Sequence, residues 1–392
     1  MKSQRESRLK FLHPITVVIG VLLTFSGCAK EPSGPERRNE NGVEVVINGD
    51  RPYPIDGKLA TLTIKEEFRI DLEDPKYAEM GLSDVAKADL DSQGRVVLFR
   101  QFAGEGPLVF IFDERGSFLR SFGRRGQGPG EVSDPFPIGV TGSDEIAIRD
   151  SLTKILFFDS NGTLLRTASS PVPILGQAGL SLLANGNYLI QYPRLGEGGE
   201  LKEIAVGVFD PAFRKIKDIA AFDLPGAIGP VPVFCYSGSE IFLGFEKNGT
   251  DISVFDLNGD PIRIIRKRYP QVSIPSGFLD DLLKRFPSNH PQRANLRLPA
   301  FFPAFQCLYS DSEGRLYVAT SEKDVATGQN ICEIFSPDGT FIRRAALGYF
   351  DFLKWIFGGK PGDMVIRDGR VLCVRDKDNG YREVIVSSIK WE

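Results

Sequence analysis

The residues best suited to chemistry lie in one glycine-rich segment, Phe122-Gly-Arg-Arg-Gly-Gln-Gly-Pro-Gly-Glu131. Its polar side chains are Arg124, Arg125, Gln127 and Glu131. Backbone amides and two guanidinium groups could bind a carboxylate or phosphate, because arginine matches either anion with two parallel hydrogen bonds. The glycines could also build a fixed corner in which one arginine pairs with Glu131, and we favour this structural interpretation. No P-loop lysine opens a helix here, which argues against a nucleotide site.

Two further segments carry candidate binding residues. Residues 349–357 include five aromatic side chains, among them Trp355. They could form a stacking platform for a sugar or peptide, or they could pack in the core. Residues 265–305 are mildly basic, predict a helix over 277–286, and contain His290 between an asparagine and a proline. A basic insertion favours acidic ligands, although a solvated helix face is the default interpretation.

Enzyme chemistry has weak support, because only His290 lies outside the N-terminal signal segment. A zinc site built from several histidines is excluded, and a Ser-His-Asp triad would depend on this one residue. Calcium needs only oxygen ligands, and Asp84, Asp89 and Asn185 could contribute some. Such residues more often form turns. We therefore expect no cofactor and keep calcium as the alternative.

The cysteines after residue 28, which could be metal ligands, are dispersed along the chain. Cys235, Cys307, Cys332 and Cys373 show no close metal-ligand spacing. Cys235 and Cys307 fall at similar places in neighbouring sequence units, so a disulfide between them is one alternative. Buried free thiols are the preferred interpretation.

The elements that position these residues are encoded by an internal repeat. In each copy an apolar run ends in an aromatic and a polar residue, followed by a glycine turn and a second apolar run with arginine. The copies lie at residues 110–120, 157–166, 208–210, 254–263 and 334–343. A period of roughly 40 to 50 residues indicates small sheets that must stack on their neighbours, as in a β-propeller.

Spacing within the repeat predicts the number of blades. The third strands of successive units end 46, 51, 46 and 80 residues apart. The longest interval contains the insertion at about 265–305. A sixth unit follows without its fourth strand, which Leu59–Ile64 or Phe68–Leu72 could supply. We expect an all-β fold over residues 56–392, a six-bladed β-propeller with four-stranded blades closed by an N-terminal strand. Seven blades is the alternative.

These motifs also carry a family resemblance. The pattern Asp-x-x-Gly, an apolar strand and Phe-Asp-x-x-Gly-x-Leu-x-Arg resembles NHL-type propeller repeats. The segment Phe122–Glu131 is similar to the hallmark loop of a lipoprotein-rich bacterial family of NHL-like six-bladed β-propellers. The resemblance covers most of the chain after residue 43. It implies a six-bladed ring and indicates little about a ligand.

The first 28 residues predict where the protein resides. A basic start precedes the apolar run Ile15–Phe25, which is shorter than the roughly 20 residues that span a bilayer. The run ends in Phe-Ser-Gly-Cys28, and small residues before a cysteine resemble the bacterial lipobox, in which that cysteine is lipidated. Cleavage as an ordinary secretory signal is the alternative. Ala29, rather than aspartate, favours the outer membrane by analogy with lipoprotein sorting.

Residues 29–55 are rich in polar residues, glycine and proline. They predict a flexible tether with a reach of roughly 25 to 30 Å. The net charge of −3 argues against nucleic-acid binding.

We therefore expect a monomeric, lipid-anchored protein of the bacterial cell envelope. Its long propeller loops would bind a protein, peptide or glycan without catalysis. A calcium-dependent lyase or hydrolase with its site at the central channel is the alternative.

Overall fold

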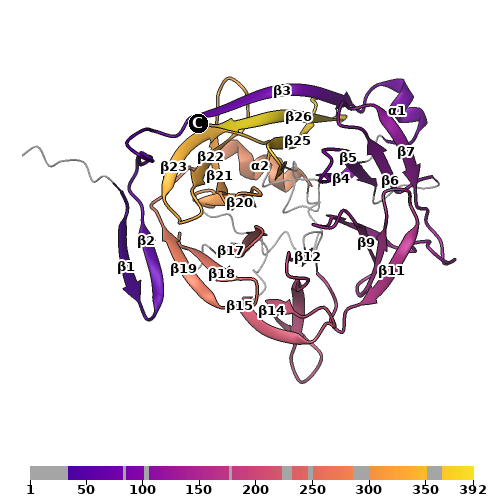
Figure 1. Cartoon of the computed structure of the whole chain (residues 1–392), viewed down its shortest axis with the longest axis horizontal. Coiled ribbons are helices and arrows are strands. Elements are labelled where there is room, and N and C mark those ends of the chain that lie inside the picture. The colour runs from indigo at the N-terminus through magenta and orange to yellow at the C-terminus, as the bar shows by residue number, and fades with distance from the viewer. Residues whose placement is uncertain are drawn as a thin grey trace, which may run out of the picture. The chain divides into compact units, whose positions relative to one another are not determined.

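The computed structural model describes residues 34–82, 85–100, 106–175, 179–222, 232–245, 250–285, 300–350 and 364–392. All of them belong to the unit Ser33–Glu392. In this unit six sheets surround a central axis, as Figure 1 shows. The predicted all-β, six-bladed propeller is thereby confirmed.

Each blade runs from an inner strand at the axis to an outer strand at the rim. The first blade holds β4 (Val85–Leu90), β5 (Val96–Arg100), β6 (Val109–Phe112) and β7 (Phe118–Phe122). The second holds β8 (Pro135–Val140), β9 (Ile146–Asp150), β10 (Lys154–Phe158) and β11 (Leu164–Ser169). The third holds β12 (Leu180–Leu182), β13 (Tyr188–Leu195), β14 (Leu201–Phe209) and β15 (Lys215–Phe222).

The other three blades repeat this plan. The fourth holds β16 (Val233–Tyr236), β17 (Glu240–Gly244), β18 (Ile252–Asp256) and β19 (Pro261–Arg266). The fifth holds β20 (Phe305–Ser310), β21 (Leu316–Lys323), β22 (Asn330–Phe335) and β23 (Phe341–Ala346). The sixth holds β24 (Met364–Arg367), β25 (Arg370–Asp376), β26 (Arg382–Trp391) and, from the other end of the chain, β3 (Leu62–Asp71).

The sixth blade closes the ring with β3. This strand pairs antiparallel with β26 along its whole length, from Glu383↔Asp71 to Trp391↔Leu62. The sequence offered two separate early strands for this role, and β3 overlaps both as one ten-residue strand. A register shift between Val386 and Ser387 accommodates this length. Closure pairs the C-terminal strand, which would otherwise leave an open sheet edge.

Residues assigned to the flexible tether form a hairpin instead, so that prediction is wrong for this part of 29–55. Strands β1 (Glu36–Glu40) and β2 (Val43–Ile47) pair with each other, and β2 continues the fourth blade by pairing parallel with β19. The segment is polar because β1 is the exposed outer edge, whereas Val45 and Val46 of β2 are fully buried. The buried amide of Asn48 joins the hairpin to the fifth blade.

The repeated aspartate has a structural cause. The Oδ1 atom of Asp159 accepts hydrogen bonds from the amides of Asn161 and Thr163, both at 2.8 Å. Asp113, Asp210 and Asp256 make the same pair of contacts with residues two and four positions later. This turn formation explains why aspartate ends the third strand of successive blades.

The repeated glycine is required for two physical reasons, its backbone conformation and the space around it. Gly162 has φ +87°, a region that other residues rarely adopt, and a Cβ atom there would lie 2.5 Å from Cγ of Phe122 in the preceding blade. Gly116 stands in the same relation to Phe68. The turns therefore allow neighbouring blades to approach closely, and mixed clusters of side chains from adjacent blades form the core.

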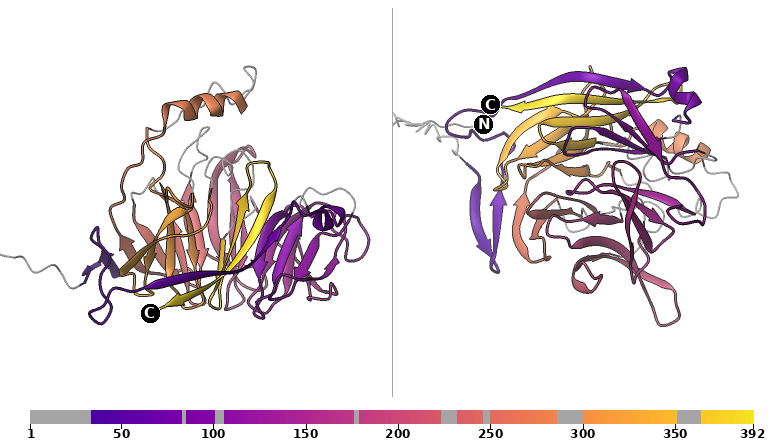
Figure 2. Two further views of the ribbon diagram at one scale, coloured as in Figure 1. Left: turned by 90° about the horizontal axis from the view of Figure 1, so that it is seen from above. Right: turned by 45° about the vertical axis from the view of Figure 1, so that its right-hand side comes forward.

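Two short helices lie outside the blades, α1 (Pro75–Glu79) and α2 (Ser276–Arg285). Helix α2 occurs where the sequence predicted one, and Figure 2 shows it raised above the ring. No helix in the described ranges combines the length and apolar character needed to cross a membrane. The four cysteines after residue 28 are free thiols, so the disulfide alternative is not realised.

Candidate functional site

The glycine–arginine loop, residues 123–134, connects β7 to β8 between the first two blades. Its two limbs are hydrogen bonded to each other, because the amide of Val132 donates to the carbonyl of Arg124 at 3.1 Å. Its end is fixed to the second blade by Asp150, whose Oδ1 accepts from the amide and hydroxyl of Ser133 at 3.0 and 2.7 Å. The loop is therefore held at both sides.

The carboxylate of Glu131 fills the interior of this loop. Its Oε2 accepts from the amide of Gly128 at 2.8 Å, and its Oε1 accepts from Nε of Arg124 at 2.6 Å. A Cβ atom on Gly126 would lie 1.9 Å from Oε2, so glycine is needed there. The hydrogen bond from Gly128, reinforced by Arg124, lowers the pKa of Glu131. The amide that the sequence offered to an external anion is thus taken by the chain's own carboxylate.

The remaining polar groups of the loop face outward. The side chain of Arg124 is 77% exposed even though its Nε is held by Glu131. Arg125 donates to the carbonyl of Ser133 at 3.2 Å, and Gln127 is exposed. The loop therefore presents two guanidinium groups, each held by a hydrogen bond, and one side-chain amide to solvent.

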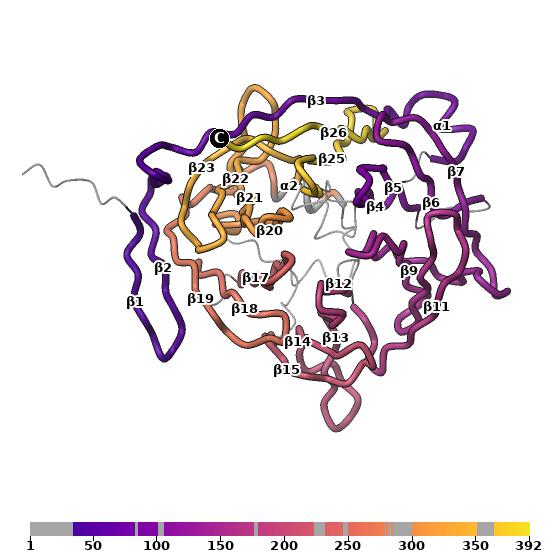
Figure 3. Tube along the Cα trace, viewed as in Figure 1, coloured from indigo at the N-terminus to yellow at the C-terminus, as the bar shows by residue number. Residues whose placement is uncertain are grey.

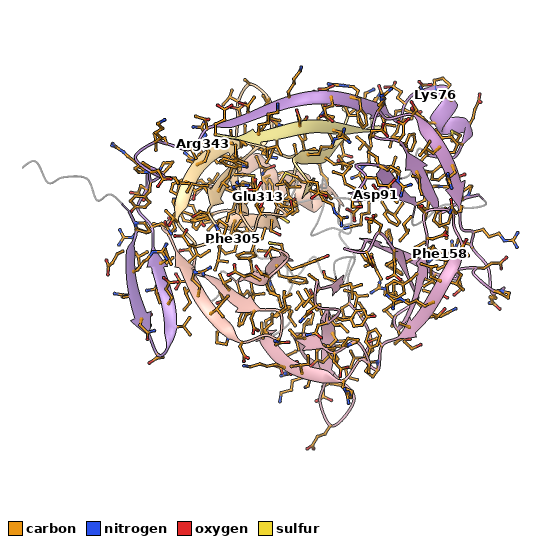
Figure 4. All side chains as sticks on the ribbon, viewed as in Figure 1. Lys76, Asp91, Phe158, Phe305, Glu313 and Arg343 are labelled. Carbon is orange, nitrogen blue, oxygen red and sulfur yellow. The ribbon has the colours of Figure 1, made fainter. Side chains whose placement is uncertain are left out.

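A surface hollow of about 410 Å³ lies beside the loop. The loop contributes Gly123, Arg124, Pro129, Gly130 and Glu131, and the second blade contributes Phe158, Gly162 and Leu164. Phe158 is buried and Leu164 is 37% exposed, so the second blade supplies an apolar wall. Figure 4 shows Phe158 near the outer edge of the ring. The hollow combines apolar surface with the charged pair of Arg124 and Glu131.

The other candidates divide into two groups. Cys28, Asp84, His290 and Trp355 lie outside the described residues. Asp89 and Asn185, considered as calcium ligands, form hydrogen bonds to backbone amides. Asp89 accepts from Leu90 and Val140, both at 2.8 Å, and Asn185 accepts from Asn187 at 3.1 Å. Among the described residues, no group of three or more His, Cys, Asp or Glu is arranged to hold a metal ion.

Sequence reasoning named Asp89 but missed three other polar residues on the inner strands, Lys87, Tyr236 and Arg367. Lys87 and Asp89 of β4, Tyr236 of β16 and Arg367 of β24 are half-exposed within the ring. Arg367 donates to the carbonyl of Leu90 at 2.6 Å, which links the sixth blade to the first. The alternation of buried and half-exposed residues in β4 was readable, but only the fold shows that these strands share one axis.

Comparison with known proteins agrees with this architecture. Residues 92–219 match the model of a six-bladed β-propeller family. No curated protein sequence matches the chain. The matched stretch includes most of the first blade, the whole glycine–arginine loop, the second blade and part of the third.

Three solved structures are among the similar ones. Regucalcin from Agrobacterium tumefaciens, a calcium-binding protein, is 13% identical, with a TM-score of 0.38 and coverage of 78% of this chain and 91% of that one. Raptor from Chaetomium thermophilum is 12% identical, with a TM-score of 0.36 and coverage of 79% of this chain. The chain spans only 28% of the Raptor chain. BBS1N in complex with ARL6DN is 8% identical, with a TM-score of 0.36 and coverage of 78% and 77%.

Proposed function

We propose that this chain is a lipid-anchored binding protein of the bacterial cell envelope that engages a partner protein through the glycine–arginine loop and its hollow. Lipidation at Cys28, the outer-membrane address and the relation to NHL-like lipoproteins are parts of this proposal. They rest on the signal-like first 28 residues and on the motif resemblance.

The observation that carries the proposal is the fixed, exposed guanidinium group of Arg124 at the rim of an apolar hollow. Binding normally costs the ordering of loops and long side chains, and Glu131 has already ordered this arginine. Arginine beside apolar surface is typical of the residues that dominate binding energy at protein interfaces. The hollow therefore suits a partner segment with an acidic residue next to an apolar one.

The same geometry favours binding over catalysis. A general acid or base works best with a pKa near the operating pH. The pKa of Glu131 is lowered instead, because its carboxylate accepts hydrogen bonds from Gly128 and Arg124. Its oxygens hold the loop in shape, so proton transfer by this carboxylate would compete with the structure of its own site.

Few residues separate the proposed lipidation site from the first hairpin. The hairpin begins at Glu36, only eight residues after Cys28. Eight residues span at most about 28 Å when fully extended. A partner of the anchored protein would therefore be met near the membrane surface.

The test is site-specific photocrosslinking in the native envelope with the full, anchored chain. A photoreactive residue replaces Leu164 in the hollow, and the control replaces Ile216, which is 45% exposed on the outer strand of the third blade. We expect one reproducible protein adduct from position 164 and none from position 216. Equal adducts at both positions, a polysaccharide adduct, or no adduct at position 164 would overturn the proposal.

A second comparison isolates the guanidinium group. Arg124→Gln removes its charge, while Arg115→Gln removes the charge of an 84% exposed arginine in the β6–β7 turn of the first blade. We expect the adduct yield from position 164 to fall at least fivefold with R124Q and to stay unchanged with R115Q.

A further inference from the structure

The second and third strands of the third blade form a long hairpin. Strands β13 and β14 have eight and nine residues, compared with five and four in β5 and β6 of the first blade. Their pairing starts at equivalent positions, with Tyr188↔Phe209 in the third blade and Val96↔Phe112 in the first. The additional residues therefore lengthen the other end of the hairpin, by about 10 Å at roughly 3.3 Å per residue.

The tip of this hairpin, residues 195–202, is exposed and held by its own contacts. Leu195 and Leu201 pair across the two strands and are 62% and 40% exposed. The amide of Gly196 donates to the carbonyl of Glu200 at 2.8 Å, which closes the turn. The carboxylate of Glu200 lies against the turn, since a Cβ atom on Gly196 would lie 2.1 Å from its Oε1. The tip is therefore ordered before it meets a partner, and this order lowers the cost of binding.

The hairpin tip has an excess of negative charge. Glu197 and Glu200 are exposed, and neither forms an ion pair with any residue that the structure describes. Arg194, next to the tip, is already paired with Glu203 at 2.5 Å. Lys202 is the one cation in the sequence of the tip. The tip therefore presents two leucines beside two carboxylates that are available to a partner.

The hollow beside the glycine–arginine loop has complementary chemistry. Phe158 and Leu164 form its apolar wall. The loop beside it carries two exposed arginines, Arg124 and Arg125, and one carboxylate, that of Glu131. The volume of about 410 Å³ falls within the range of roughly 300–1,000 Å³ that is typical of ligand pockets, so the hollow accommodates a few side chains. Apolar and acidic side chains on a hairpin tip meet these requirements.

The hairpin tip of the same molecule does not occupy this hollow. The described residues that line the hollow come from the glycine–arginine loop and the second blade, and none comes from the third. Figure 3 shows β13 and β14 in the blade that follows β9 and β11 around the ring. The hollow and the tip are therefore separate surfaces of one molecule, and each is open to a second molecule.

We propose that the hollow binds the β13–β14 tip of a second copy of this chain, with the two leucines against the apolar wall and the carboxylates toward Arg124. This inference rests on the proposed function and names its partner. A contact of this size is weak in solution, since interfaces below about 1,200 Å² are typical of transient encounters. Anchoring of both copies to one membrane raises their effective concentration. The chain is then monomeric in solution, as expected from the sequence, and associates at the membrane.

The test uses two differently tagged forms of the full, anchored chain in the native envelope. The donor form carries a photoreactive residue in place of Leu164, and the acceptor form, in excess, keeps leucine there. We expect an adduct that carries both tags, with the crosslinked peptide containing residues 195–202. An adduct with a different protein, or between copies through another segment, would overturn this inference and leave the use of the hollow for protein binding intact. The absence of any protein adduct would overturn both proposals.

Variants confined to the acceptor isolate the tip, because the hollow of the donor stays unchanged. Leu195→Ser combined with Leu201→Ser should lower the yield of the doubly tagged adduct at least about fivefold. The matched control Val325→Ser changes a fully exposed residue in the β21–β22 connection and should leave the yield unchanged. Glu197→Gln combined with Glu200→Gln should lower the yield at least about threefold, and this pair decides the question if the leucine variant fails to fold. Equal yields from all acceptors would refute binding through the tip.

Discussion

Substitution of Gly162 by alanine tests whether close contact between blades determines the repeat. The backbone at φ +87° costs about 1–2 kcal/mol for an L-residue. The added Cβ would also lie 2.5 Å from Cγ and 2.6 Å from Cβ of Phe122, so rotation of the ring alone cannot relieve the clash. Overpacking of this kind costs about 1–3 kcal/mol, which gives a total of about 2–5 kcal/mol.

Gly380→Ala is the matched control. Gly380 has φ +86°, but nothing lies within 4 Å of a Cβ built there, so only the backbone strain applies. With an unfolding entropy of about 2.1 cal/mol/K per residue over the unit Ser33–Glu392, each kcal/mol lowers Tm by about 1.3 °C.

Thermal melts followed by circular dichroism should therefore show a fall of about 3–7 °C for G162A and about 1–3 °C for G380A. The difference between the two variants measures the contact with Phe122. Equal shifts would refute the argument, because the glycine would then be required only for its backbone conformation.

Three further predictions concern separate parts of the ring. Asn48→Ala leaves the amide of Phe341 and the carbonyl of Gly339 without their partner. It should lower the free energy of unfolding, measured in urea, by about 2–4 kcal/mol. The control Asn39→Ala, at an exposed position, should lower it by about 0.5 kcal/mol. Equal effects would show that the hairpin is not fixed to the fifth blade. Lys267→Met removes the nearer cation of the buried Glu333 carboxylate, 3.0 Å away, and leaves only Arg344 at 3.6 Å, so it should lower the free energy of unfolding by about 3 kcal/mol. Lys217→Met on the surface should lower it by at most about 1 kcal/mol. A small loss for K267M in the same unfolding assay would contradict that expectation. The pKa of Glu131 is lowered in the fold, so its support of the loop is complete above the ordinary glutamate value and is lost as pH falls through the folded one. The NMR shift of the Gly128 amide should follow that titration and should be flat in Glu131→Gln, and a titration that persists in the variant would assign it to another group.

The repeat was readable because its key residues act locally. The carboxylate of Asp159 accepts hydrogen bonds from the amides two and four residues later, and Gly162 closes the same turn. The need for aspartate and the need for glycine are therefore both visible within five residues of the sequence. The pairing of Arg124 with Glu131 was predictable for a similar reason, since the two lie seven residues apart in one loop.

The structural features that the sequence did not predict depend on contacts between residues far apart in the chain. The hairpin β1–β2 is held by β19 and the fifth blade, more than 200 residues away, and its average composition resembles a linker. Arg367 donates to the carbonyls of Leu90 and Thr141, which lie 277 and 226 residues away in the sequence, and only a closed ring brings these groups together. Local patterns therefore predicted the blades and the loop, whereas the hairpin contact and the contacts of Arg367 required the closed ring.

Function in a repeat protein is best sought where one unit departs from the others. Asp113, Asp159, Asp210 and Asp256 recur with the same two amide contacts, and this recurrence identifies them as parts of the scaffold. Arg367 does not recur: the last residue of the inner strand is leucine in β4 and β12, valine in β8, tyrosine in β16, serine in β20 and arginine in β24. The arginine nevertheless has a use within the ring, because its guanidinium group donates to the carbonyls of Leu90 and Thr141 in the first and second blades. A departure from the repeat therefore indicates function only after contacts within the ring have been accounted for, and the photocrosslinking comparison of R124Q with R115Q applies this criterion to the exposed guanidinium group of Arg124.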